Sequence, residues 1–318
     1  MLPQPLTRKL GVGINYHGYF HDLIVRHLDL IDYIEVSPDI FCEEVIGGDA
    51  TDINQRHFRL DTHKLQDALA IGNLRPVVVH GLSLSIGSAS GWNSDYLNIL
   101  DQYAQQQTLA WHSEHLGFML VQNQDGSDSH AGLILPMQFT QEAADLLCPR
   151  IQHLCDHYQI PFLIENTTYY LPNFTAGDNN HWDEIDFLNQ LLTRTSCGLL
   201  LDLYNFYCNA INFGFDPYAA LNRLQLDRVI EIHVAGGVTH EGFVLDVHSR
   251  EVPDAVWELL AWVLPKVPNL CAITYELLEQ ALSVTGEEKI VAQLQRCNAF
   301  WNEYTAYWMA REEHHVAA

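Results

Sequence analysis

Residues 228–249 read RVIEIHVAGGVTHEGFVLDVHS. The first part is rich in β-branched residues and stops at the turn sequence AGG, a pattern typical of a buried strand. His233 lies at the carboxyl end of this predicted strand. Asp246 and His248 follow two positions apart, so in an extended segment their side chains point to the same side. Histidine and aspartate are ligands of first-row metals, and the stretch therefore predicts part of a metal site.

Outward from this stretch, apolar strand-like segments alternate with helical segments along the chain. The predicted strands are residues 10–15, 33–37, 76–81, 111–116, 161–166, 197–203, the strand within 228–249, and 270–277. The predicted helices are residues 19–28, 60–71, 94–108, 138–158, 182–192, 218–224, 253–264 and 289–308, and residues 41–54 form a polar loop. Strands that each precede a helix predict an α/β fold, one (β/α)8 TIM barrel domain over residues 1–318.

Composition and charge exclude several classes of partner. The chain has 16 basic and 40 acidic residues, a formal net charge of −24, which repels nucleic acid phosphates and anionic membranes. No apolar run reaches the length of a membrane span, and the N-terminus lacks a signal peptide's apolar region, so we expect a cytoplasmic protein. The 7 cysteines form no CxxC pair, which indicates neither a disulfide framework nor a thiolate zinc site.

Polar side chains recur at the carboxyl ends of six consecutive predicted strands, where the active site of a barrel enzyme lies. They are His80, Glu114, His115, Glu165, Asn166, Asp202, Asn205, His233 and Glu276, joined by Asp246 and His248 from the loop after the seventh strand. One strand-end carboxylate can cap a helix or bind an arginine, but a repeated pattern favours a shared site. A single ion cannot use so many ligands, so we expect two or three metals. Mixed histidine and carboxylate ligation suits iron, manganese or zinc. By alternation His115 should face away from Glu114 and pack behind the site.

Several strings resemble, in order, the multinuclear non-haem iron-dependent oxidative enzymes of the methanobactin-biosynthesis oxidase type. They are VVHGLSLSIGS, SEHL, IENTTYYLP, LLDLYN, EIHVAG, DVHS and YELLE, and the resemblance runs from residue 11 to about residue 300. It implies a barrel of the xylose-isomerase-like kind that holds two or three iron ions in the Fe2+ and Fe3+ states. It also implies O2 as co-substrate and a ribosomally made precursor peptide as substrate, modified mainly at cysteine.

The same resemblance assigns roles to particular residues. It gives the metal-ligand role to His80, Glu114, Glu165, Asn166, Asp202, His233, Asp246, His248 and Glu276, and catalytic roles to Asp39 and Asn205. Asp39-Ile40 stands where the family usually has Glu-Asn, so Asp39 is expected to supply a shorter carboxylate. Since no appended domain is evident, a separate partner protein is expected to bind the leader of the precursor peptide.

Two other interpretations stay open. The first is a metal-dependent hydrolase or isomerase on the same barrel, similar to endonuclease IV or to a sugar isomerase. The net charge of −24 is unsuited to DNA, residues 202–205 read DLYN where the endonuclease has Asp-x-x-His, and no lysine falls at a strand end. The second is a non-catalytic, metal-dependent protein that binds a peptide, which a catalytic assay would distinguish.

Overall fold

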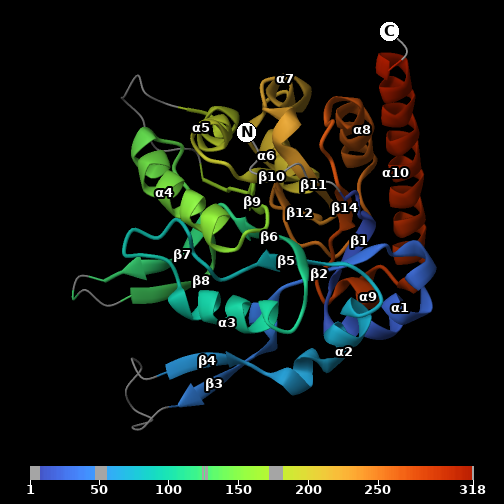
Figure 1. Cartoon of the computed structure of the whole chain (residues 1–318). Coiled ribbons are helices and arrows are strands. Elements are labelled where there is room, and N and C mark those ends of the chain that lie inside the picture. Colours follow the sequence, from blue (N-terminus) through green and yellow to red (C-terminus); the bar gives the residue numbers. More distant parts are fainter. Residues whose placement is uncertain (1–7, 47–55, 124, 126–127, 172–181, 317–318) are drawn as a thin grey trace.

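The computed structural model describes residues 8–46, 56–123, 125, 128–171 and 182–316 (Figure 1). Eight parallel strands close into a barrel in which each strand pairs with the next barrel strand along the chain and the last with the first. The strands are β1 Gly11–Tyr16, β2 Tyr33–Val36, β5 Val77–Gly81, β6 Leu109–His115, β9 Phe162–Glu165, β10 Gly198–Asp202, β11 Val229–Val234 and β14 Ala272–Tyr275. This closed order confirms the (β/α)8 barrel that the sequence predicts.

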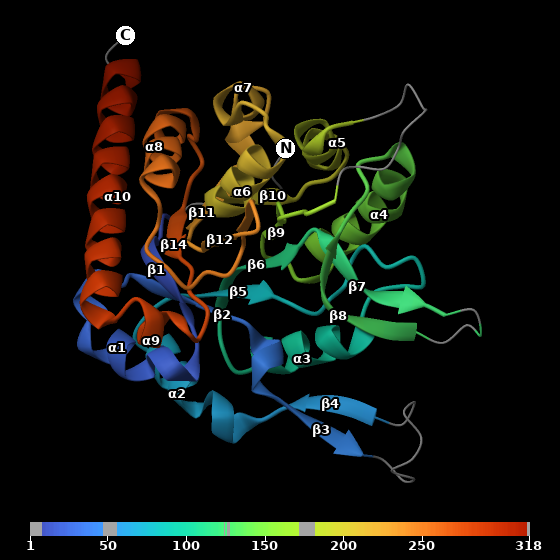
Figure 2. The same cartoon turned by 180° about the vertical axis from the view of Figure 1, so that it is seen from behind.

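Helices cover the outside of the barrel, and the long α10 runs beside β1 and β14 (Figures 1 and 2). The α-helices are α1 His21–Arg26, α2 Thr62–Gly72, α3 Ser94–Ala104, α4 Gln141–His157, α5 Glu184–Arg194, α6 Leu203–Phe213, α7 Pro217–Leu221, α8 Asp254–Val263, α9 Ala281–Val284 and α10 Glu287–Val316. Short 3-10 helices are η1 Gly18–Phe20, η2 Leu28–Leu30, η3 Pro38–Phe41, η5 Leu226–Arg228 and η6 Leu264–Lys266. Within the described ranges, no helix is both long and apolar enough to cross a membrane.

Three two-stranded hairpins extend from the loops that follow barrel strands. They are β3 Cys42–Ile46 with β4 Arg56–Leu60, β7 Gly117–Gln122 with β8 Asp128–Pro136, and β12 Val238–His240 with β13 Phe243–Leu245. The sequence predicted a polar loop over residues 41–54. In the structure Cys42–Ile46 is a strand instead, and residues 47–54 lie outside the described part of the chain.

The helix after the sixth barrel strand begins earlier than the sequence predicted. Strand β10 ends at Asp202, and α6 follows without a loop, whereas a short helix was expected only at residues 218–224. The Asp202 side chain caps α6 by accepting a hydrogen bond of 2.7 Å from the backbone N–H of Asn205. Aspartate at an N-cap satisfies a backbone donor that the first turn leaves unpaired. Asp202 is therefore both the last residue of β10 and the start of α6.

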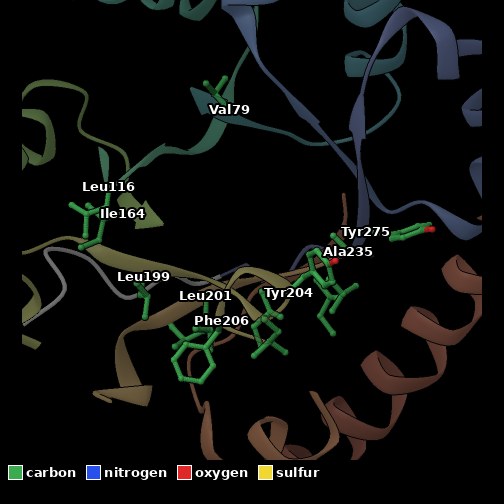
Figure 3. Close-up of a cluster of buried hydrophobic side chains, with 14 of the residues drawn as sticks. Val79, Leu116, Ile164, Leu199, Leu201, Tyr204, Phe206, Ala235 and Tyr275 are labelled. Carbon is green, nitrogen blue, oxygen red and sulfur yellow. The ribbon is translucent and has the colours of Figure 1, made fainter. Parts of the chain in front are cut away.

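Alternation along the strands builds two apolar layers. In β10, Leu199 and Leu201 pack outward into the core between strands and helices, and Figure 3 shows them there with Phe206. Leu200 instead lies inside the barrel, in a separate cluster that includes Trp111. Because side chains alternate, the residue after an outward leucine faces the barrel axis again. The inner layer therefore supports the polar residues at the carboxyl ends of the strands.

Truncating a buried outward leucine should destabilise the fold strongly. Leu201 is 0% exposed, so Leu201→Ala should lower the free energy of unfolding by about 2–5 kcal/mol through lost burial and a cavity. Leu133→Ala is the matched control, since Leu133 is 59% exposed and its loss should cost about 0.5 kcal/mol or less. Urea unfolding followed by circular dichroism measures both. Equal losses in the two variants would contradict the burial assigned to Leu201.

Candidate metal centre

His233 lies at the middle of a group of carboxylates at the carboxyl end of the barrel, and it is fully buried. Its Nδ1 lies 3.0 Å from Glu276 Oε2, 3.9 Å from Glu165 Oε1 and 4.0 Å from Asp202 Oδ2. The four residues come from the ends of β11, β14, β9 and β10. Their candidate ligand atoms all lie within 4.8 Å of one another. One metal ion can be held between them.

A second group lies on the other side of Glu165. His80 Nε2 and His115 Nε2 each lie 3.2 Å from Glu165 Oε2, and these three ligand atoms also lie within 4.8 Å of one another. Glu165 therefore turns one carboxylate oxygen toward His233 and the other toward the two histidines. A carboxylate in this arrangement can bridge two metal ions, as in sites where two metals lie about 3.5–4 Å apart.

Asp246 and His248 approach the same centre from the loop after β11. His248 Nδ1 lies 3.1 Å from Glu276 Oε2, and its Nε2 lies 4.0 Å from Asp202 Oδ2 and contacts Asp246 Oδ1. The backbone of His248 has φ of +36°, a region that residues other than glycine seldom adopt. Such strain is common at functional positions, where the surrounding structure enforces it.

The glycines of the turn after β11 allow this return of the chain. A Cβ on Gly236 would lie 2.1 Å from the carbonyl oxygen of Glu251, and one on Gly237 would lie 2.2 Å from that of Leu245. Neither position has room for a larger residue. The AGG turn therefore lets the segment that contains Asp246 and His248 fold against the end of β11.

Several buried atoms at the centre lie within ion-pair distance of one another but form no hydrogen bond of good geometry among the described residues. They are His80 Nε2, Glu165 Oε2, Asp202 Oδ2, Asp246 Oδ1 and His248 Nε2. Buried polar atoms are normally hydrogen-bonded, because an unsatisfied one costs free energy. All five atoms belong to residue types that ligate divalent metals and face one another. The donor set therefore fits metal ions.

In the metal-free centre, shifted pKa values keep protons on several of the candidate metal ligands. Burial lowers the pKa of His80, but the carboxylates of Glu165 and Glu35 together raise that pKa to about 10. Burial raises the pKa of Asp202 well above its usual range although His248 opposes the shift. Burial also opposes ionisation of Glu276, yet His248 and His233 hold its pKa well below the usual range. A metal that bound here would displace some of these protons.

Glu114 and His115 lie the opposite way round from the sequence-based prediction. His115 faces the barrel axis and contacts Glu165, so the prediction that it packs behind the site is wrong. Glu114 faces α3, where its Oε2 and the Tyr96 hydroxyl lie so close to Gly81 that an added Cβ there would meet them at 2.2 and 2.1 Å. Side chains alternate along β6 as expected, but the residues that face the barrel axis are the ones that were expected to face outward. The structure does not bring the predicted ligand Glu114 into either group.

Three other predicted residues support the loops around the centre. Asn166 exchanges two hydrogen bonds of 2.9 Å with the backbone of Asp202. Asn205 accepts a bond from Thr168 and donates to the carbonyl of Asn166. Asp39 accepts bonds from the backbone N–H of Leu82 and from the Ser83 hydroxyl, and burial raises its pKa. These contacts join adjacent strand ends, and the predicted roles of Asp39, Asn166 and Asn205 in metal binding or catalysis stay predictions.

The sequence-based set omits Glu35 and Glu231. Glu35 lies in β2 and Glu231 in β11, and their Oε2 and Oε1 atoms lie 3.0 and 3.6 Å from His233 Nε2. Both are fully buried. The available signal was a carboxylate inside a strand of otherwise apolar residues, since such a group needs partners when it is buried.

A cavity of about 610 Å³ lies at the opposite end of the barrel. Residues that line it include Leu10, Pro76, Leu109 and Pro161, near the amino ends of the strands. Its described lining contains no histidine and no carboxylate. The groups able to bind metal or move protons therefore lie at the carboxyl end, where barrel enzymes carry their active sites.

The chain is similar to known proteins over most of its length. Residues 11–302 match the family model described as RiPP precursor modification enzyme MbnB/TglH/ChrH. A UPF0276 protein of Caulobacter vibrioides is 32% identical over 291 residues, 92% of this chain and 93% of that protein. A UPF0276 protein of Acaryochloris marina is 30% identical over 303 residues, 94% of this chain and 97% of that protein.

Solved structures support the fold alone. The structure of the IOLI protein with a zinc atom aligns with a TM-score of 0.53 at 12% identity, over 92% of this chain and 99% of that one. A D-psicose 3-epimerase from Clostridium cellulolyticum, crystallised with D-tagatose, covers 94% of this chain and 99% of its own, with a TM-score of 0.48 and 12% identity. The predicted (β/α)8 TIM barrel is confirmed.

Substituting His115 and Glu114 separately tests which of the two residues binds metal. His115→Ala should lose the metal held with His80 and Glu165 and keep the metal beside His233, because only the first group uses His115. Glu114→Gln is the matched control and should keep both. Metal content after loading with excess Zn2+ is measured by mass spectrometry, and circular dichroism checks the fold. Metal loss in Glu114→Gln without loss in His115→Ala would show that Glu114 is the ligand and His115 is not.

Metal affinity should rise with pH. His80, with a pKa of about 10, is protonated in the metal-free protein at neutral pH, and a metal binds only its neutral form. Each displaced proton should strengthen binding by about tenfold per pH unit until the pH approaches about 10. Competition with a chelator between about pH 6 and pH 9, corrected for the chelator's own protonation, measures this slope. A flat profile would show that no proton leaves on binding.

Proposed function

Because this chain belongs to the MbnB/TglH/ChrH family of RiPP precursor modification enzymes, we propose that it uses O2 and two or three iron ions to oxidise a ribosomally made precursor peptide at cysteine. RiPP denotes a ribosomally made peptide that enzymes modify after its synthesis. In this proposal residues 1–318 act as one barrel domain. The iron, the use of O2 and the cysteine target are the specific parts that experiment must test.

The observation that carries the proposal is the shared carboxylate of Glu165. One oxygen faces the group of His80 and His115, and the other faces the group of His233. A bridging carboxylate favours two metals close enough to act on one substrate. Histidine and carboxylate ligation without a protein thiolate is typical of non-haem iron, although zinc and manganese also accept it.

Each part of the centre then has a separate task. His80, His115 and Glu165 would hold one metal; Glu165, Asp202, His233 and Glu276 would hold a second. His248 stands beside Asp202 and Glu276 and contacts Asp246, and together with Asp246 it would complete a third position. When bound, iron would supply electrons to O2 and would lower the pKa of a substrate thiol.

The geometry favours the substrate peptide as the source of any thiolate that binds a metal at this centre. None of the cysteines belongs to a candidate metal group among the described residues. A thiolate that coordinates a metal here would therefore come from a cysteine of the peptide. The centre lies at the end of the barrel where loops can position a peptide, and burial of the ligands limits the access of water.

The partners proposed are a precursor peptide and a separate protein that binds its leader. A family of precursor modification enzymes supports the peptide as substrate. The leader-binding partner follows from the resemblance alone, and co-purification with the products of neighbouring genes is its test. A net charge of −24 disfavours nucleic acid as an alternative partner.

A zinc-dependent hydrolase or isomerase is the second candidate. The same ligand set accepts zinc, and the similar IOLI structure contains a zinc atom. That likeness concerns the fold, so it carries less weight than membership of the family. A metal-dependent binding protein without activity would keep the metal groups and leave every peptide unchanged.

Co-expression tests the proposed reaction. Short cysteine-containing peptides encoded beside the gene should change mass when co-expressed with this chain and its neighbouring partner, and only when O2 is present. Versions with cysteine replaced by serine should stay unmodified, as should peptides given to His233→Ala or His248→Ala, because both changes remove a predicted ligand. Mass spectrometry of the peptide is the measurement. Full activity of zinc-loaded protein together with inert iron-loaded protein would replace the oxidase by a hydrolase.

A further inference from the structure

His233 has a second side, which faces down into the barrel. Its Nε2 lies 3.0 Å from Glu35 Oε2 and 3.6 Å from Glu231 Oε1. The candidate ligand atoms of these three residues lie within 4.8 Å of one another, as they do in the two groups above. The lower side of His233 is therefore either a further metal position or a support that orients the imidazole ring.

The surroundings of Glu231 favour a support. Its Oε2 accepts a hydrogen bond of 2.7 Å from Trp111 Nε1. Its Oε1 accepts bonds of 3.0 Å from the Tyr33 hydroxyl and 2.6 Å from the Thr274 hydroxyl. Both oxygens are thus satisfied by protein donors, and a metal on this carboxylate would have to compete with them.

The contrast with the upper side of His233 is clear. On the Nδ1 side of the ring, Asp202 Oδ2 is a buried atom without a hydrogen-bond partner among the described residues. Nδ1 faces Asp202 Oδ2, Glu165 Oε1 and Glu276 Oε2. Nε2 faces Glu35 and Glu231, and protein donors satisfy both oxygens of Glu231. A buried acceptor without a partner indicates a place where a cation can bind, whereas a satisfied acceptor belongs to a complete hydrogen-bond network.

We infer that Glu35 is a positioning residue, which accepts a hydrogen bond from His233 Nε2–H and so directs Nδ1 toward the metal held with Glu165, Asp202 and Glu276. Metal-ligating histidines commonly donate their other ring N–H to a carboxylate, which fixes both the tautomer and the ring. Glu231 lies beneath this pair and holds the floor of the centre through Trp111, Tyr33 and Thr274. The inference rests on the metal centre of the proposed function but on no substrate or oxidant.

Glu35 variants test this role in the His115→Ala background, which removes the metal held with His80. A titration with Zn2+ then reports the remaining positions, of which only the His233 group contacts Glu35. Glu35→Ala should weaken Zn2+ binding about 10–100-fold, because the ring is no longer held, while the number of ions bound at saturation stays the same. Glu35→Gln should bind nearly as tightly as the background, because its amide oxygen still accepts from Nε2–H. The matched control is Glu184→Gln, a change at a buried carboxylate that contacts Asn209 instead of His233.

Two outcomes of the titration would overturn the inference. Unchanged affinity in Glu35→Ala would show that the hydrogen bond does not position the ring. Loss of a bound ion at saturation in both Glu35→Ala and Glu35→Gln would show that Glu35 is itself a ligand. The titration uses Zn2+ alone, so failure to find a modified peptide would sink the proposed function without altering this result.

A crystal structure of the unaltered chain loaded with Zn2+ keeps the inference testable even if Glu35→Ala does not fold. The expected result is zinc on His233 Nδ1 with Nε2 still within hydrogen-bond distance of Glu35. Zinc on Nε2, between Glu35 and Glu231, would overturn it.

Discussion

The carboxyl end of this barrel depends on the buried carboxylate of Glu165, which lies between the pair His80 and His115 and the single histidine His233. It lies 3.2 Å from both His80 and His115 on one side and 3.9 Å from His233 on the other. Acidic groups rarely lie so deep unless cations or hydrogen bonds compensate them. In the metal-free protein, protons on the histidines balance these carboxylates, and bound metal ions would take the place of some of those protons.

The rest of the barrel keeps these charges in place. Leucines of β10 alternate between the outer core and the barrel interior, so the strand places Asp202 on the axis and continues directly into α6. Trp111, Tyr33 and Thr274 hold Glu231 beneath His233. Stability comes from the apolar layers, whereas the cost of the unsatisfied polar atoms is confined to one end. Such a division lets a rigid fold carry a strained, incompletely satisfied site.

Sequence patterns predicted the barrel and most of its polar carboxyl ends, because a repeated strand and helix order allows few folds. They could not predict which of two neighbours faces the axis. Glu114 and His115 are adjacent, and a shift of one residue exchanges their directions. Glu35 was hidden for a similar reason, since a strand residue shows its partners only once the other strands are in place. The start of α6 was also missed, because Asp202 ends β10 and caps α6 without the loop that separates most strands from helices.

The most direct test of the two-metal centre is anomalous diffraction from crystals of the chain loaded anaerobically with iron. We expect at least two iron peaks, of which two lie about 3.5–4 Å apart, one beside His80 and His115 and one beside His233, with an oxygen of Glu165 bound to each. A single iron peak, or two peaks with both oxygens of Glu165 on the same ion, would contradict it.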